Sequence, residues 1–235
     1  VPDVTCASQS RKYDFVPKGP ILIEMFPKHD DFAVRTVGLP GMIGALGACF
    51  GRVVTLDSPK ARPPGDFNWA PTLWHELAHV ITLQMSNQRL PRWLSEGISE
   101  YEETVARPGR WGRAGDLMFA NLMNRGETIK LKELNAAFQN PQLIGVGYYQ
   151  ASLVVNHIVE RFGHEGLRRL VAVHAKGMDD ESGLKAALNI DFDDLQATFD
   201  KAMEARFGAI RAALKPPSGD AELLKMPVDA LKALA

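Results

Sequence analysis

Two histidines and a glutamate stand within one turn of a strongly helical stretch, and this pattern constrains the fold more than any other. The sequence reads WHELAH at residues 74–79, inside an apolar pattern with the 3.6-residue period of a helix from about Ala70 to Ser86. Side chains four residues apart share one helix face, so His75 and His79 can grip a single metal ion. The apolar neighbours predict that this face points inward, where buried histidines need polar partners.

These residue types suit zinc. Zinc accepts imidazole nitrogen at about 2.0–2.1 Å and prefers four ligands. Glu76 is offset around the helix from both histidines, so it can reach a water at the metal without occupying the metal, which is the position of a general base. The alternative is a chance HExxH whose histidines lie on the helix surface.

A third ligand candidate favours the metal site over the chance match. It is Glu96 in PRWLSEGISEYEE at residues 91–103, seventeen residues after His79. We expect it at the start of a second helix, from about Glu96 to Ala106, that Ser95 caps. Two histidines and one glutamate leave the fourth zinc position for water, which is the catalytic rather than the structural pattern.

Two neighbouring features are open to more than one interpretation. Glu100 lies one turn beyond Glu96 and is a candidate acceptor that orients a ligating imidazole. Its alternative is a solvated charge beside Glu102 and Glu103. The Arg- and Gly-rich segment 107–115 is either a cover over the cleft or an ordinary surface loop.

The paired motifs resemble the peptidase-MA-like group of gluzincin zinc metallopeptidases. They are similar, more distantly, to the M1 aminopeptidases, whose third-ligand segment also reads Trp-Leu-x-Glu-Gly. The resemblance spans roughly residues 20–210 and includes the helical segments 148–163 and 187–195. It implies zinc-dependent hydrolysis of peptide bonds by a metal-activated water, with one Zn²⁺ as cofactor and a peptide or protein as substrate.

The same resemblance suggests a role for one of two adjacent tyrosines. Tyr148 takes the place of a family tyrosine whose hydroxyl stabilises the oxyanion formed during hydrolysis. Tyr149 is the alternative, because neighbouring residues on a helix point about 100° apart and only one can face the metal.

One departure from the M1 pattern is informative. In the M1 aminopeptidases, a Gly-Ala-Met-Glu-Asn segment precedes the zinc motif, and its glutamate binds the free amine of the substrate. Here the corresponding segment is GACFG at residues 47–51, with Phe50 in place of that glutamate. This argues against an M1-type aminopeptidase and favours internal cleavage. Sheet edges pair with extended peptides, and the candidates for such an edge are Gly51, Arg52, Val53 and Val54.

A protein of another class is the main rival. A peptidase-like module could hold zinc and bind peptides or proteins without cleaving them. The intact Glu76 argues against this rival, because a non-catalytic site has no need of a general base. A purely structural zinc domain is disfavoured because three protein ligands leave one position open.

The wider pattern predicts an α+β fold of the thermolysin-like or gluzincin-like zincin type. A small N-terminal sheet packs on the HExxH helix, and a mainly helical lobe follows. We expect an irregular lead-in at 1–20 and a metallopeptidase domain at 21–213, divided into 21–88 and 89–213. Residues 214–235 form a linker and a terminal helix, which in a longer protein could lead to a further helical domain.

Individual elements follow from hydrophobic periodicity and breaker residues. Two short apolar runs predict strands, at 21–26 and 49–56. Further helices are predicted at about 30–37, 115–124, 130–138, 148–162, 164–176, 180–188 and 192–213.

Composition excludes some classes of partner. The net charge is −1 and basic residues form no stripe, so nothing suggests nucleic acid or an anionic membrane surface. No apolar run approaches the roughly 18 residues that a membrane span needs. Cys6 and Cys49 lack zinc-ligand spacing, and whether they pair stays open. The compartment is undecided, although related domains are often secreted, which favours a periplasmic or secreted location.

Overall fold

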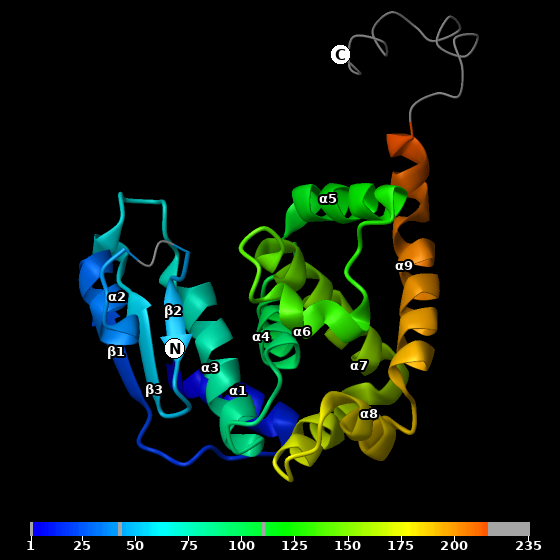
Figure 1. The fold of residues 1–235 in the computed structure, drawn as a ribbon. Helices are drawn as coiled ribbons and strands as arrows, with labels where there is room; N and C mark the ends of the chain where they lie inside the picture. The colour runs from blue at the N-terminus through cyan, green and yellow to red at the C-terminus, as the bar shows by residue number, and fades with distance from the viewer. Residues whose placement is uncertain (1, 42–43, 110, 216–235) are drawn as a thin grey trace, which may run out of the picture.

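The computed structural model describes residues 2–41, 44–109 and 111–215, with side chains from residue 7 onward. In these ranges a small sheet stands at one end and helices make up most of the rest (Figure 1). The expected α+β arrangement is therefore confirmed, with helix as the larger part. Residues 216–235, most of the predicted linker and terminal helix, lie outside the described residues.

The sheet has three strands in the order β1-β3-β2. Strand β1 (Leu22–Phe26) runs parallel to β3 (Val53–Asp57), and β2 (Gly47–Cys49) runs antiparallel to β3 on its other side. Helix α2 (His29–Val37) follows β1, as predicted. The central strand is therefore β3, and β2 forms one edge.

The single strand predicted at 49–56 is wrong, and with it the proposed edge. Gly51 adopts a left-handed backbone conformation, with φ of 79°, which glycine adopts at little cost. The chain reverses there, so β2 and β3 form a hairpin closed by a hydrogen bond from Phe50 N to Val53 O at 2.8 Å. Of the four candidate edge residues, Gly51 and Arg52 lie in the turn, and Val53 and Val54 lie in the central strand.

The irregular lead-in predicted at 1–20 is also wrong in its first part. Helix α1 spans Pro2–Tyr13, although its polar sequence has no apolar stripe that would reveal it. Polar contacts hold it instead: Gln9 Nε2 donates to the Trp74 carbonyl at 3.3 Å, and Tyr13 Oη donates to Glu102 at 2.8 Å. Lys12 adds an ion pair to the same carboxylate at 2.8 Å.

Helix α3 (Trp69–Met85) carries the HExxH motif and lies between the sheet and the helical lobe (Figure 1). Its sheet-facing side packs against the strands through Leu73, Leu77 and Val80. On another side, Ile81 belongs to the larger core of the helical lobe. Burial on both sides fixes the rotation of α3, and hence the direction of its histidines.

Helix α4 (Arg92–Ala106) lies alongside α3 and packs closely on α7 (Ile144–His174). The close approach depends on Gly97, where a methyl group would stand 2.8 Å from the Ala151 carbonyl oxygen. Glycine at this position therefore lets α4 settle on α7 with the preceding residue, Glu96, directed at α3.

The predicted cap of this helix is wrong. The helix begins at Arg92 with Pro91 as its N-cap, so Ser95 lies within the first turns and is buried. The side-chain oxygen of Asn135 accepts a hydrogen bond from the Trp93 backbone N–H at 3.2 Å. A tertiary contact, not a local cap, thus satisfies one of the free N–H donors at the start of this helix.

The helical lobe completes the fold. Helix α7 is interrupted at Gly163, whose φ of 67° and ψ of 176° are not helical, in agreement with the stop predicted there. Among the described residues, no helix is both long and apolar enough to cross a membrane. The remaining elements are η1 (Pro59–Ala61), α5 (Gly112–Arg125), η2 (Leu131–Glu133), α6 (Leu134–Ala137), α8 (Asp180–Leu188) and α9 (Phe192–Leu214).

Candidate metal centre

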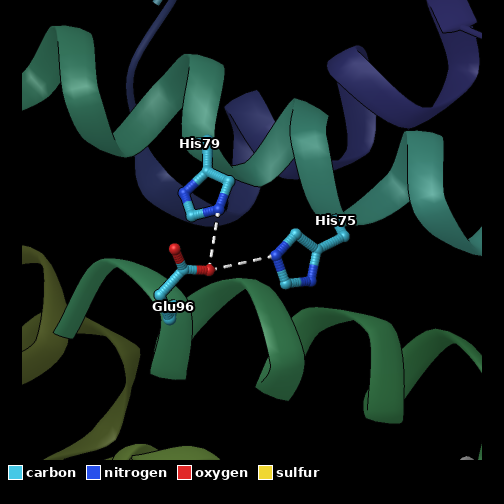
Figure 2. Close-up of side chains that lie close together, drawn as sticks. All are labelled: His75, His79 and Glu96. Atoms are coloured by element: carbon cyan, nitrogen blue, oxygen red, sulfur yellow. Dashed lines mark hydrogen bonds and ion pairs between the residues drawn. The ribbon is translucent and has the colours of Figure 1, made fainter. Parts of the chain in front are cut away.

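Three ligand-type side chains from two helices converge on one point. His75 and His79 project from α3 and Glu96 projects from α4 toward both of them (Figure 2). The Glu96 Oε2 atom lies 3.3 Å from His75 Nε2 and 3.3 Å from His79 Nε2. The three side chains are nearly buried, at 12%, 9% and 13% exposure for His75, His79 and Glu96.

This donor set fits a zinc ion. Two ligands about 2.0–2.1 Å from a tetrahedral ion stand about 3.3–3.4 Å apart, which is the separation between Glu96 Oε2 and each imidazole. Both histidines direct Nε2 at the carboxylate, while their Nδ1 atoms contact other side chains. Imidazole nitrogen and carboxylate oxygen, the donor types present here, are both common zinc ligands.

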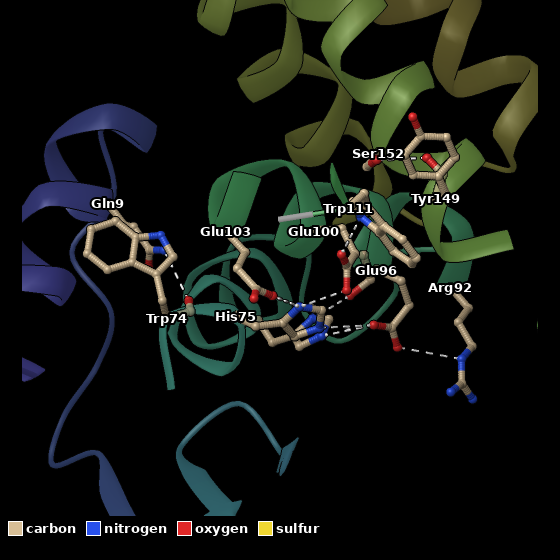
Figure 3. Close-up of polar contacts among 12 residues, drawn as sticks. Gln9, Trp74, His75, Arg92, Glu96, Glu100, Glu103, Trp111, Tyr149 and Ser152 are labelled. Atoms are coloured by element: carbon tan, nitrogen blue, oxygen red, sulfur yellow. Dashed lines mark hydrogen bonds and ion pairs between the residues drawn. The ribbon is translucent and has the colours of Figure 1, made fainter. Parts of the chain in front are cut away.

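The outer nitrogen of each histidine has its own partner. His79 Nδ1 lies 3.0 Å from Ser95 Oγ. His75 Nδ1 lies 3.6 Å from a Glu100 oxygen and 3.7 Å from a Glu103 oxygen. A hydrogen-bond partner of the Ser95 kind fixes the tautomer and the ring orientation of a metal-binding imidazole, while the two carboxylates lie at ion-pair distance from the His75 ring. Figure 3 shows both carboxylates directed at the His75 ring.

The acidic residues of α4 are not a solvated cluster. Glu100, Glu102 and Glu103 are 4%, 2% and 5% exposed, which contradicts the solvated alternative for Glu100. Glu100 accepts a hydrogen bond from Trp111 Nε1 at 3.1 Å (Figure 3). A buried carboxylate is costly without partners. Each of these three carboxylates has one, and their contacts stabilise the position of α4, which carries Glu96.

Glu76 lies beside the metal-ligand cluster, not in it. It is 5% exposed, and its Oε2 atom has no hydrogen-bond partner among the described residues. The backbone of β2 lies against its other oxygen, since a methyl group at Gly47 would stand 2.7 Å from Oε1. The Glu76 carboxylate is therefore held against β2 at Oε1, while Oε2 is buried away from solvent.

The two tyrosines point in different directions. Tyr148 lines the cleft together with His75 and Glu76, and its ring contacts Phe138 edge-on at 5.1 Å between centroids. Tyr149 instead donates its hydroxyl to Asp116 Oδ1 at 2.7 Å and lies away from His75 in Figure 3. Of the two candidates, the structure brings Tyr148 to the cluster.

The cleft over the cluster has two compartments that share His75, Glu76, Gly47 and Tyr148. One, of about 370 Å³, continues along Ala48 and Cys49 of β2 toward Leu83, Leu90 and Arg92. The other, of about 270 Å³, is walled by Glu100, Glu103 and Trp111. Trp111 belongs to the segment 107–115, so part of that segment forms a wall of the cleft. A third cavity, of about 320 Å³, lies behind Trp111 and lacks the metal-ligand cluster.

Electrostatics favour a charged cluster when no metal balances it. Burial lowers the pKa of His75, but the carboxylates of Glu103 and Glu96 outweigh it and raise that pKa well above its ordinary value. Burial acts against ionisation of Glu96, but the two histidines hold its pKa well below the usual range. Burial also raises the pKa of the Tyr148 phenol, which therefore keeps its proton at neutral pH and can donate it in a hydrogen bond.

Cys49 does not contribute a ligand to this cluster. Cys49 is a free thiol in the cleft wall, and burial raises its pKa to about 12. The Cys6 side chain lies outside the described residues.

Comparison with known proteins agrees with this geometry. A family model described as the Peptidase MA superfamily matches residues 63–205, which is more than half of the 235 residues. The chain therefore belongs to the Peptidase MA superfamily. The matched range contains α3 and α4, and so all of the candidate metal ligands. No curated protein and no solved structure matches the chain.

Proposed function

We propose that this protein is a zinc-dependent peptidase of the gluzincin type. The convergence of Glu96 Oε2 on His75 Nε2 and His79 Nε2, at 3.3 Å from each, carries the proposal. His75, His79 and Glu96 would hold the ion. Family membership supports a metallopeptidase-like activity.

The bound ion would lower the pKa of a water molecule and polarise the carbonyl of the scissile bond. The Glu76 carboxylate would act as the general base, taking the proton of the attacking water and passing it to the leaving amine. The contact of its Oε1 with β2, whose residues line the cleft, keeps the carboxylate oriented. Tyr148 donates its hydroxyl to the oxyanion of the substrate.

The substrate would lie along β2. This strand is an edge of the described sheet, and its three residues line the cleft beside Glu76. An extended peptide can add to such an edge through backbone hydrogen bonds. Phe50, which replaces the amine-binding glutamate of the M1 pattern, is 51% exposed and provides no charge for a free amine. These features favour an endopeptidase.

A cleavage assay tests the proposal. The zinc-loaded protein and a Glu76→Gln variant are incubated with a diverse peptide library, and products are identified by mass spectrometry. We expect internal cuts by the wild-type protein and their loss in the variant, with zinc content equal in both. Wild-type turnover by Glu76→Gln would overturn the general-base assignment. Binding of library peptides without any cuts, in zinc-loaded wild-type protein, would instead favour a peptide-binding module.

A further inference from the structure

Arg92 lies in the cleft beside the metal ligands. It is the first residue of α4, one turn before Glu96, and it lines the larger compartment with His79, Glu96 and Tyr148. Its Nε lies 3.6 Å from Glu96 Oε1, and its side chain is 56% exposed. Figure 3 shows Nε turned toward Glu96 and the two terminal nitrogens turned away from it. The planar end of the guanidinium is thus accessible from the cleft.

The contacts around Arg92 position its charge without enclosing it. The guanidinium lies over the Phe138 ring, 5.8 Å from its centroid, and it interacts with the Tyr148 phenol both by hydrogen bonding and through its charge. The carboxylate that pairs with Arg92, that of Glu96, directs its other oxygen at both histidines. A metal cation bound by His75, His79 and Glu96 would draw on the negative charge of Glu96, and less of that charge would then be left to balance Arg92.

The two compartments differ in charge. Among the described residues that line the larger one, Arg92 is the only lysine or arginine, and apolar Leu83 and Leu90 stand near it. The smaller compartment presents Glu100 and Glu103 instead. A ligand group at the Arg92 end therefore meets a cation next to apolar surface, which suits a residue with an aliphatic part and a terminal anion.

We propose that Arg92 binds a carboxylate of the substrate within one or two residues of the scissile bond. Arginine is suited to this because its terminal N–H groups bind both oxygens of a carboxylate at once. Because Arg92 Nε lies 3.6 Å from Glu96, a candidate metal ligand, a carboxylate bound by Arg92 would lie close to the cleaved bond. An acidic side chain and the C-terminal carboxylate of a peptide both offer this chemistry. The side chain agrees with internal cleavage, whereas the C-terminal carboxylate would place the cleaved bond at the end of the peptide. The position relative to a scissile bond rests on the proposed peptidase function, whereas the binding of a carboxylate by Arg92 does not.

Binding is tested with four peptide probes and needs no turnover. One pair is benzoyl-Gly-Gly with a free C-terminal carboxylate and the same peptide as its amide. The second pair is benzoyl-Gly-Glu-amide and benzoyl-Gly-Gln-amide. Dissociation constants are measured by calorimetry on the zinc-loaded Glu76→Gln protein. We expect the charged member of one pair to bind at least about tenfold more tightly, and the pair that shows this difference identifies the source of the carboxylate.

Variants assign the preference to Arg92. We expect Arg92→Gln, in the same background, to reduce the ratio between the charged and neutral probes to about one. Arg92→Lys should keep part of it, because it keeps the charge but loses the planar fork. Arg125→Gln is the matched control, since Arg125 is 68% exposed on α5 and lies outside the cleft. Melting temperature and zinc content establish that each variant is folded and loaded.

The outcomes separate this inference from the proposed function. A ratio that Arg92→Gln leaves unchanged, or charged and neutral probes that bind equally to the Arg92 protein, would overturn the role of Arg92. An equal weakening of all four probes would also overturn it, because it indicates a general effect on the cleft. Loss of the ratio, together with no cleavage of any library peptide by the wild-type protein, would support Arg92 and reject the peptidase.

Discussion

The carboxylate of Glu76 lies directly against the backbone of Gly47. A methyl group on Gly47 would stand 2.7 Å from Glu76 Oε1 and 2.8 Å from Thr72 Cγ2. Strand β2 therefore approaches α3 this closely because residue 47 has no side chain. The same contact holds the proposed general base on the side of the cleft where the substrate would lie.

Gly47→Ala should reduce peptide cleavage strongly without removing the metal. The added methyl group must displace Glu76 or β2, and a shift of about 1 Å in a catalytic group costs about a hundredfold in rate. Turnover and zinc content are measured on the same preparation. Gly145→Ala is the control, because a methyl group there meets nothing within 4 Å. Wild-type turnover by Gly47→Ala would show that the contact is unimportant.

Ser95→Ala should weaken zinc binding by about 10- to 100-fold, because Ser95 Oγ contacts His79 Nδ1 at 3.0 Å and outer partners of this kind orient the ligand. Competition with a zinc chelator gives the affinity. Ser99→Ala on the same helix is the control: Ser99 Oγ is buried without a hydrogen-bond partner among the described residues. Equal zinc affinities in the two variants would rule out this role for Ser95.

Cys49 should react slowly with alkylating reagents. Burial raises its pKa to about 12, so the thiolate fraction at pH 8 is on the order of 10⁻⁴, and the thiolate is the reactive form. The rate should keep rising with pH beyond the range in which a free cysteine, with a pKa of about 8.5, levels off. Iodoacetamide labelling of a Cys6→Ser variant measures this. A rate that levels off near pH 9 would contradict the raised pKa.

Tyr13→Phe should lower the free energy of unfolding by about 1–3 kcal/mol, because it removes a hydrogen bond to a buried carboxylate. Tyr13 is 1% exposed and donates to Glu102, which is 2% exposed. Urea denaturation measures the change. Arg11→Met, an exposed position on the same helix, should stay within about 0.5 kcal/mol of the wild type. A Tyr13→Phe protein as stable as this control would show that α1 is not anchored through Tyr13.

Periodic and motif signals in the sequence predicted both helices that carry the candidate metal ligands, although α4 begins at Arg92 and not near Glu96. The strong apolar period of α3 fixes the face of His75 and His79, and the position of Glu96 follows once the next helix reverses. Glu103 follows Glu96 by seven residues on the same helix, so the two side chains share a helix face with Glu100. Glu103 was therefore within reach of sequence reasoning, although the run of acidic residues suggested a solvated surface.

Other features depend on contacts between distant segments. Helix α1 is held by Glu102 and by the Trp74 carbonyl, which no local pattern in its polar sequence can indicate. The hairpin at Gly51 was missed because a glycine inside an apolar run fits both a strand and a left-handed turn. Arg92 became a candidate for substrate binding only when the structure placed its side chain in the cleft.

The most direct test of the account is the metal content of the purified protein and of single-ligand variants. Native mass spectrometry after zinc loading should find about one zinc per wild-type chain, as a site with two histidines and one glutamate requires. His75→Ala, His79→Ala and Glu96→Ala should each lose it, while Glu76→Gln keeps it. Full zinc occupancy in the three ligand variants, or no zinc in the wild type, would contradict the proposed centre.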